Sequence, residues 1–359
     1  MNLDENSLLR VTDVGLYCKQ GNFFIDPWHP VERAIVTHAH ADHLCRGCGN
    51  YLVARDGIFV TRTRLDERAT IETVCYGEPI EINGVRVSLH PAGHILGSAQ
   101  IRVEHHGQVW VVSGDYKVEP DLTCQPFEPI RCHIFISECT FGLPVYRWPA
   151  SSDVYAEILR WWQANRSERR TSLLYAYALG KAQRLLVGLA AAVGAEGSLP
   201  GPIYTHGAVE TMNRAYRTTG VKLPATTYVA EAGPTVDWST ALVVAPPSAH
   251  GTPWARRFGP ASSAFASGWM RLRGTRRRRA VDRGFVLSDH VDWPGLLAAI
   301  DATGAETVFL THGYTAVVAR WLREQGKDAH PVATHYEGER DDAAEPTVDP
   351  SPEPRASEP

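Results

Sequence analysis

A short run of metal-binding side chains carries the clearest chemistry in this sequence. An apolar segment at residues 34–36 is directly followed by three histidines and an aspartate: His38, His40, Asp42 and His43. A strand sends alternate side chains to opposite faces, so the first two histidines project the same way, and a turn after them brings the other two residues back. Imidazole nitrogens and a carboxylate oxygen bind Zn, Mn or Fe at roughly 2.0–2.2 Å. The run therefore predicts a metal site.

Three more ligand candidates occur later, where apolar runs give way to glycine-marked turns: His94, Asp115 and His312. Any one of them alone is explained as well by a hydrogen-bonded loop residue. One Zn or Mn ion takes three or four protein ligands, whereas seven are enough for two ions about 3.5–4 Å apart that share a carboxylate. The combined set therefore predicts a dinuclear site.

The order of these motifs resembles the metallo-β-lactamase fold. Three further segments resemble motifs of its β-CASP branch, whose members process nucleic acids. Residues 136–142 (ISECTFG) are similar to motif A and place its acid at Glu138. Residues 287–292 (LSDHVD) are similar to motif B and place its histidine at His290, and residues 311–313 (THG) are similar to motif C. Within the branch, the motifs most resemble the bacterial ligase-associated DNA exonuclease group.

The resemblance implies an α/β fold, namely a metallo-β-lactamase αββα sandwich with an inserted β-CASP cap domain. We expect the sandwich to comprise residues 1–147 and 264–336, with the cap at 148–263. The first part alternates short apolar segments with Gly and Pro turns, as sheets of a sandwich do. Helix-capping residues and one apolar helical face begin at about residue 151, where the cap is expected to start.

In this interpretation His38, His40 and His94 hold one divalent ion, and Asp115 bridges to a second. The second ion takes the remaining ligands: Asp42, His43 and His312. Two cations lower the pKa of a water between them and neutralise charge on a phosphoryl group, so no side-chain nucleophile is needed. Both Zn and Mn are compatible with this ligand set.

Five titratable residues are expected to support the chemistry around these ions. We predict that His290 donates a proton to the leaving oxygen or hydrogen-bonds a phosphate oxygen, and that Glu138 orients it. Asp42 is counted as catalytic as well as ligating. Asp26, which ends the strand before the histidine run, and Asp289, beside His290, are predicted to support the ligands from behind.

Residues 180–184 (GKAQR) resemble a helix-opening segment of the β-CASP cap. Backbone amides at a helix N-terminus with a lysine alongside can bind a phosphate, which makes Gly180 and Lys181 candidate nucleic-acid contacts. An ordinary strand-to-helix turn is the alternative.

An arginine run is the second candidate contact with nucleic acid. Six of the nine residues 271–279 are arginine, close to Trp269. Guanidinium groups pair with phosphates and an indole stacks on a base, so the predicted contacts are Trp269, Arg271, Arg273, Arg276 and Arg277. A solvated loop is the alternative.

The net charge of −4 is concentrated in the last residues. Residues 337–359 hold eight acids against two arginines, which leaves +2 for the rest of the chain, and five prolines. With almost nothing to bury, this segment is predicted to be a disordered acidic tail. Seven cysteines show no regular framework, and no apolar run reaches membrane length, so a cytoplasmic protein with reduced thiols and no membrane association is expected.

These observations favour a metal-dependent DNA nuclease acting on single-stranded or flapped DNA in repair, alongside a DNA ligase and a helicase as the subgroup resemblance implies. An RNA-processing nuclease of the same branch is the alternative. No identified residue reads a ribose 2′-hydroxyl, the group that distinguishes RNA from DNA. A hydrolase of small substrates is disfavoured by the inserted cap, Glu138 and His290. A non-catalytic scaffold is disfavoured because no expected ligand is missing.

Overall fold

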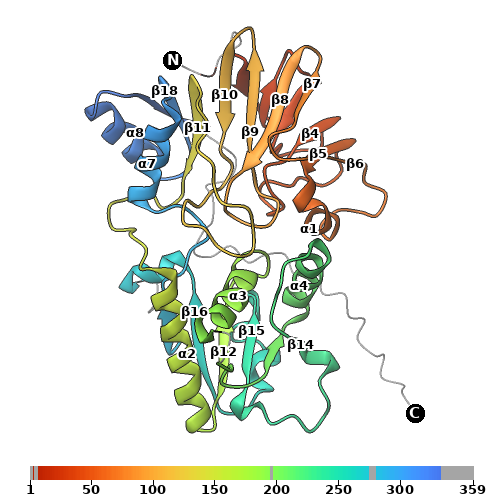
Figure 1. The fold of residues 1–359 in the computed structure, drawn as a ribbon, viewed down its shortest axis with the longest axis vertical. Helices are drawn as coiled ribbons and strands as arrows, with labels where there is room; N and C mark the ends of the chain where they lie inside the picture. Colours follow the sequence, from red (N-terminus) through yellow and green to blue (C-terminus); the bar gives the residue numbers. More distant parts are fainter. Residues whose placement is uncertain (1–2, 4–6, 195–196, 275–279, 333–359) are drawn as a thin grey trace.

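The computed structural model describes residues 3, 7–194, 197–274 and 280–332. Its α/β fold contains two six-stranded sheets and one seven-stranded sheet. We number the sheets in chain order, so the first and third have six strands and the second has seven. The first and second sheets form the upper half of the molecule in Figure 1, and the third forms the lower half. Arg276, Arg277 and the predicted acidic tail lie outside the described residues.

The first sheet contains the strands that lead into the histidine run. Its six strands follow chain order: β1 (Leu9–Val11), β2 (Leu16–Cys18), β3 (Phe23–Ile25), β4 (Arg33–Ile35), β5 (Asn50–Ala54) and β6 (Ile71–Val74). Its inner face packs against the second sheet in one apolar core to which both sheets contribute. Its outer face is covered by α1 (Ile58–Arg62) and by α4 (Gly207–Thr219) of the lower half.

The second sheet brings distant parts of the chain together. Its order is β19 (Asp328–Pro331), β18 (Thr307–Gly313), β11 (Ile134–Cys139), β10 (Gln108–Val112), β9 (Ala99–His105), β8 (Val85–Pro91) and β7 (Pro79–Ile82). Strand β11 is buried along its whole length and pairs in parallel with β10 and β18, which explains its nearly continuous apolar sequence. Helices α7 (Trp293–Thr303) and α8 (Thr315–Glu324) pack on the outer face.

The third sheet is entirely parallel. Its order is β14 (Thr227–Tyr228), β13 (Ile203–Thr205), β15 (Leu242–Ala245), β12 (Thr171–Tyr175), β16 (Ala261–Ala266) and β17 (Arg283–Phe285). Helices α2 (Ser151–Ser167) and α3 (Lys181–Val193) pack on one face, and side chains that include Val229, Phe258 and Met270 cover the other. Both faces are thus buried, as a parallel sheet requires. We call this part of the chain, from α2 to β17, the third-sheet unit.

Short helices fill the remaining connections. They are η1 (Arg55–Gly57), η2 (Val229–Glu231), η3 (Trp238–Thr240), η4 (Pro247–Ala249), α5 (Pro253–Arg256) and η5 (Gly268–Arg271). Among the described helices, none combines the length and apolar character needed to cross a bilayer.

The end of the third-sheet unit differs from the expected cap boundary at residue 263. Strands β16 and β17 pair with this sheet, so the unit continues to Phe285. The apolar sequence of β16 (ASSAFA) fits a buried strand of any sheet, and only its pairing with β12 decides which sheet it joins. The chain then re-enters the upper half through residues 286–292.

Candidate metal centre

Two groups of possible metal ligands meet at one carboxylate. His38, His40, His94 and Asp115 form the first group, in which one ligand atom of each residue lies within 4.8 Å of the others. His43, Asp115 and His312 form the second group by the same measure. These side chains follow β4, β8 and β10 or end β18, so the ends of strands in two sheets build one site. Six of the seven predicted ligands are thus brought together.

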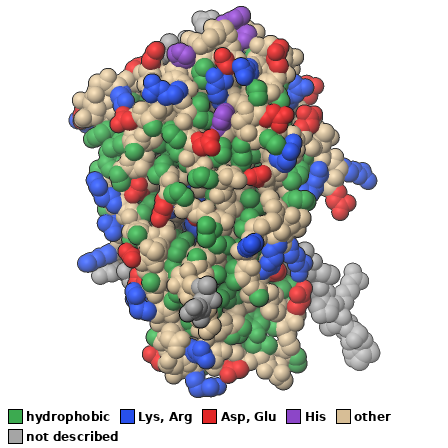
Figure 2. All heavy atoms as spheres, viewed as in Figure 1, with side chains coloured by type: hydrophobic (Ala, Val, Ile, Leu, Met, Phe, Trp, Pro, Cys, Tyr) green, Lys and Arg blue, Asp and Glu red, His purple; other side chains and the backbone are tan. Residues whose placement is uncertain are grey.

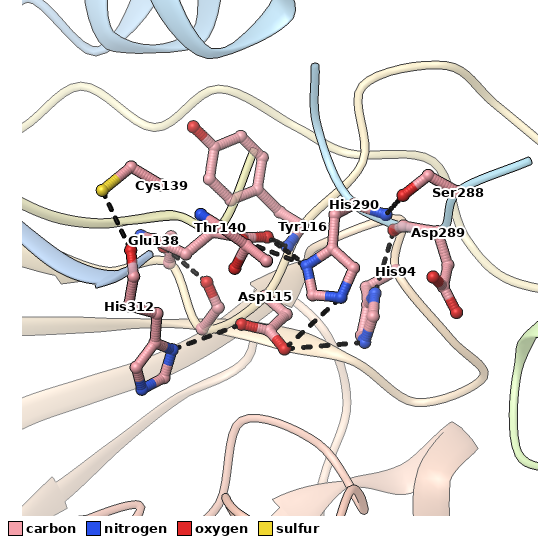
Figure 3. Close-up of polar contacts among 12 residues, drawn as sticks. His94, Asp115, Tyr116, Glu138, Cys139, Thr140, Ser288, Asp289, His290 and His312 are labelled. Atoms are coloured by element: carbon pink, nitrogen blue, oxygen red, sulfur yellow. Dashed lines mark hydrogen bonds and ion pairs between the residues drawn. The ribbon is translucent and has the colours of Figure 1, made fainter. Parts of the chain in front are cut away.

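The two oxygens of Asp115 face different histidines. Its Oδ2 lies 3.5 Å from His38 Nε2, 3.5 Å from His43 Nε2 and 3.9 Å from His94 Nε2. Its Oδ1 lies 3.6 Å from His312 Nδ1, as Figure 3 shows. Asp115 therefore contacts histidines of both groups.

Several ligand atoms are buried without a hydrogen bond. Asp115 Oδ1, His43 Nε2 and His312 Nδ1 make none among the described residues. Buried polar atoms are nearly always satisfied, so three orphaned ligand atoms in one small volume indicate that something else completes them. Two imidazole nitrogens and a carboxylate oxygen are a donor set that suits a divalent transition metal. The residues present therefore fit the predicted ions.

In three of the candidate ligand histidines, the outer ring nitrogen, which points away from the other ligands, contacts a hydrogen-bond acceptor. His94 Nδ1 lies 2.9 Å from the carbonyl of Asp289, and His43 Nδ1 lies 2.7 Å from Asp26 Oδ2. His40 Nε2 lies 3.1 Å from the carbonyl of Leu179. A carbonyl or carboxylate oxygen can only accept, so each outer nitrogen carries a proton and only the inner nitrogen can offer a lone pair to an ion.

Asp26 holds the start of the histidine run. It accepts hydrogen bonds from the backbone N–H of Thr37 at 2.7 Å and from Thr37 Oγ1 at 2.5 Å, besides contacting His43. Thr37 Oγ1 lies 3.1 Å from His38 Nδ1. These contacts place Asp26 behind two candidate ligand histidines, and its supporting role stays a prediction.

Burial and charge set the protonation states that metal binding needs. Burial lowers the pKa of His40 and of His94 to about 4, and it lowers the pKa of His38 well below its ordinary value. Burial opposes ionisation of Asp115, but the neighbouring histidines, His43 first, outweigh it and hold the pKa of this carboxyl well below its usual range. Three neutral imidazoles and one carboxylate are thus available at neutral pH.

His43 differs from the other ligand histidines in charge. Burial acts to lower its pKa, but the carboxylates of Asp115, Asp42 and Asp26 prevail and raise it well above the ordinary value. In the metal-free protein His43 is therefore protonated at neutral pH, and an ion must displace that proton.

Asp42 lies at the edge of the site. Its Oδ2 is 3.8 Å from His43 Nε2, and its side chain is 28% exposed. It lies outside the groups of potential ligands found among the described residues, so its ligand role stays a prediction. A small cavity of about 60 Å³ opens beside it, lined by Trp28, His43 and His312 among others, and connects the second group to solvent.

Glu138 and His290 form a buried pair next to the bridging carboxylate. His290 Nδ1 lies 3.0 Å from both Glu138 oxygens, and Glu138 Oε1 also accepts from the backbone N–H of Tyr116 at 2.9 Å. His290 Nε2 lies 4.0 Å from Asp115 Oδ2 (Figure 3). Nδ1 is therefore held by Glu138, and Nε2 faces the Asp115 carboxylate. His290 could also ligate an ion, because it belongs to two further potential metal groups.

Lys181 does not lie at a phosphate-binding surface. Its side chain is fully buried, with Nζ 3.1 Å from Asp289 Oδ1 and 4.4 Å from the ring centroid of Tyr177. The backbone N–H of Gly180 donates to Gln183 Oε1 at 2.8 Å. The start of α3 packs against the upper half instead of facing solvent, so the structure does not support the predicted phosphate role of Gly180 and Lys181.

Trp269 belongs to an aromatic cluster. Its ring centroid lies 4.8 Å from that of Phe141, which lies 5.8 Å from that of His290. Arg271 and Arg273 are exposed, and Arg271 Nε donates to the carbonyl of Val145 at 3.2 Å. The two arginines therefore remain available to a ligand near the site, while half-buried Trp269 has only part of its surface free.

Basic side chains do not mark a single binding path on the face drawn in Figure 2. Lys and Arg are interspersed with Asp and Glu there, over both halves of the molecule.

Sequence reasoning missed three contributors from around α3. The carbonyl of Leu179, the guanidinium of Arg184 and the carboxylate of Asp121 lie at the junction between the two halves. A backbone carbonyl leaves no signal in a sequence. Arg184 does leave one, since it directly precedes the apolar run of α3 (LLVGLAAAV), and a charged residue beside such a run needs a partner if it is buried.

Comparisons with known proteins relate the chain to enzymes that process nucleic acids. It is 30% identical over 326 residues to a probable DNA ligase from Opitutus terrae, across 89% of this chain and 30% of that protein. It is 27% identical over 140 residues to the endoribonuclease YSH1 of Saccharomyces cerevisiae, across 37% of this chain and 17% of that protein. The chain thus spans less than a third of the length of these relatives. No family model matches it.

The fold is shared with a solved structure. A protein of unknown function from Enterococcus faecalis V583 superposes with a TM-score of 0.57 and 11% identity, over 86% of this chain and 80% of that one. At this identity the likeness concerns the fold alone.

Proposed function

We propose that this chain is a metal-dependent nuclease of the β-CASP branch of the metallo-β-lactamase fold, and that it cleaves phosphodiester bonds in DNA. The observation that carries the proposal is Asp115, which lies between the two groups of histidines and contacts both of them, beside the Glu138–His290 pair. In this proposal the first two sheets are the sandwich, and the third-sheet unit is the inserted cap, ending at Phe285 instead of residue 263.

The residues of the chain take complementary parts in this reaction. The two groups would hold one divalent ion each, Zn or Mn, and these ions supply Lewis acidity toward a water and the scissile phosphate. The ionised Asp115 offsets charge between the groups. His290 Nε2 offers a proton, or a hydrogen bond, to a phosphate oxygen, while Glu138 holds Nδ1 and keeps the ring in place.

The extent of the two similarities favours DNA as the substrate. The similarity to the probable DNA ligase covers most of this chain, whereas the similarity to YSH1 covers little more than a third. A DNA ligase is the proposed partner, because the relative that is similar over most of this chain is a probable DNA ligase. RNA cleavage is the second candidate, and the similarity to an endoribonuclease favours it.

One experiment separates these activities. Metal-stripped protein is repleted with Mn, Zn or Mg and incubated with end-labelled single-stranded DNA, flapped duplex DNA and RNA of the same sequence. We expect cleavage of DNA with Mn or Zn, and loss of cleavage in Asp115→Ala. Cleavage of RNA alone would replace the DNA proposal by the ribonuclease alternative. Equal residual activity in Asp115→Ala would refute the proposed site.

A further inference from the structure

A backbone group of the third-sheet unit contacts a candidate metal ligand of the upper half. The carbonyl of Leu179, just before α3, accepts a hydrogen bond from His40 Nε2 at 3.1 Å. His40 Nδ1 then lies 3.1 Å from both His38 Nε2 and His94 Nε2. Because a carbonyl cannot donate, this contact keeps the proton on Nε2 and leaves the Nδ1 lone pair facing the other ligands. The start of α3 thus decides which nitrogen of His40 an ion can use.

Arg184, on the first turn of α3, holds the turn that carries His94. Its Nη2 donates to the carbonyls of Gly93 at 3.1 Å and His94 at 2.9 Å, and it lies 2.6 Å from Asp121 Oδ2. The guanidinium is almost fully buried. One side chain from the third-sheet unit therefore fixes the backbone on which a candidate ligand stands.

A third contact reaches the other side of His94. Lys181 Nζ pairs with the Asp289 carboxylate at 3.1 Å, and the Asp289 carbonyl accepts the hydrogen bond from His94 Nδ1 at 2.9 Å. The turn is also tightly packed, since a Cβ on Gly180 would lie 2.2 Å from Ile95 Cγ2, and the φ of Gly180 is +90°. Contacts from both sides thus hold the position of His94 relative to α3.

The second group of ligands does not share this dependence. His43 takes its outer hydrogen bond from Asp26 on the first sheet, and His312 ends β18 of the second sheet. Their positions are therefore set within the upper half.

We infer that Leu179, Lys181 and Arg184 position the ligands of one ion. This ion is the one held by His38, His40 and His94. Docking of the third-sheet unit and binding of this ion are then thermodynamically coupled, so each strengthens the other by the same factor. The inference rests on the proposed metal-dependent function. It assigns the start of α3 to the metal site, in place of the phosphate contact expected from the sequence.

Metal affinity of the metal-free protein tests the inference. Zn is titrated against a chromophoric chelator, which resolves two stepwise dissociation constants. In the double variant Arg184→Met with Asp121→Asn, which removes both charges of this buried pair together, we expect one dissociation constant to rise about 10- to 100-fold, the usual effect of removing a partner behind a ligand. The other constant should stay within a few fold.

A second variant and a control separate positioning from loss of structure. Gly180→Ala adds one methyl group against Ile95 and should raise the dissociation constant of the same ion. Arg217→Ala removes an arginine that binds Glu210 inside the third-sheet unit, away from the site, and should change neither constant. Circular dichroism and thermal unfolding verify that each variant is folded before titration.

Hydrogen exchange provides a readout that a purely structural role would not change. In the wild type, Zn should slow exchange of the α3 amides, and this added protection should be absent in the double variant. Unchanged constants in both test variants, or equal weakening in Arg217→Ala, would overturn the inference while leaving the nuclease proposal intact. A wild type that binds no Zn or Mn would overturn both.

Discussion

Replacing Glu138 with Gln tests whether this carboxylate acts through His290. Glu138 Oε1 accepts from both the Tyr116 N–H and His290 Nδ1, so a glutamine that places its oxygen there keeps both hydrogen bonds. The substitution removes the charge and places an amide NH2 where Oε2 accepts from His290 Nδ1 at 3.0 Å and from the Thr140 N–H at 3.4 Å, so the loss of charge alone gives a lower bound on the effect. A hydrogen bond to a charged group contributes about 1.5–3 kcal/mol and a neutral one about 0.5–1.5 kcal/mol, a difference of about 1–1.5 kcal/mol. Since about 1.4 kcal/mol corresponds to a factor of ten, we expect kcat to fall at least about 10-fold.

His290→Ala removes the positioned group itself and should lower kcat about 10²- to 10⁴-fold. If Glu138 works only by holding His290, the double variant should be no slower than His290→Ala alone. The assay is single-turnover cleavage of an end-labelled oligonucleotide at saturating Mn or Zn, with metal content measured for every variant. We expect unchanged metal content, because neither residue is assigned as a ligand.

Two results would refute this reasoning. A double variant slower than His290→Ala by a further factor of ten would show that Glu138 acts independently of His290. Loss of an ion in His290→Ala would show that this histidine is a ligand, which its membership of two potential metal groups allows.

Asp115→Asn should lower the affinity for both ions, because the oxygens of Asp115 face both ligand groups, and elemental analysis after dialysis measures the loss. Arg271→Gln combined with Arg273→Gln should weaken DNA binding and reduce the slope of log K against log salt by roughly 0.7 for each phosphate that is no longer neutralised. The metal-free protein should lose stability as pH falls from 7 to 5. His40 and His94 have pKa values lowered to about 4, so the unfolded chain binds their protons first, which costs on the order of 2 kcal/mol for each at pH 5; urea unfolding measures it.

Each of these predictions has a contradicting outcome. Retention of one tightly held ion in Asp115→Asn would mean that this carboxylate does not bridge. An unchanged salt slope in the arginine variant, equal to that of Arg320→Gln on the distant and exposed α8, would identify the arginine segment as solvated. A pH-independent free energy of unfolding would mean that His40 and His94 are not buried in the neutral form.

The candidate ligands of the metal centre could be named from the sequence because their residue types and their spacing along strands and turns indicate them. Alternation along a strand places His38 and His40 on one side, and a glycine turn after an apolar strand presents His94 and Asp115. The roles predicted for Asp26 and for the Glu138–His290 pair are compatible with where these residues lie. Such expectations rest on residue types and spacings, which the linear chain records.

Only the tertiary structure decided what the start of α3 does and where the third-sheet unit ends. A helix N-terminus with a lysine has the same sequence whether it faces a phosphate or a buried carboxylate, and burial of Lys181 against Asp289 depends on residues far apart in the chain. Strand β16 has a sequence that fits any sheet, and its partner β12 lies far from it in the chain. The carbonyl of Leu179 has no side-chain signature at all. Long-range pairing and backbone contacts are set by packing of the whole chain, and so local pattern alone could not predict them.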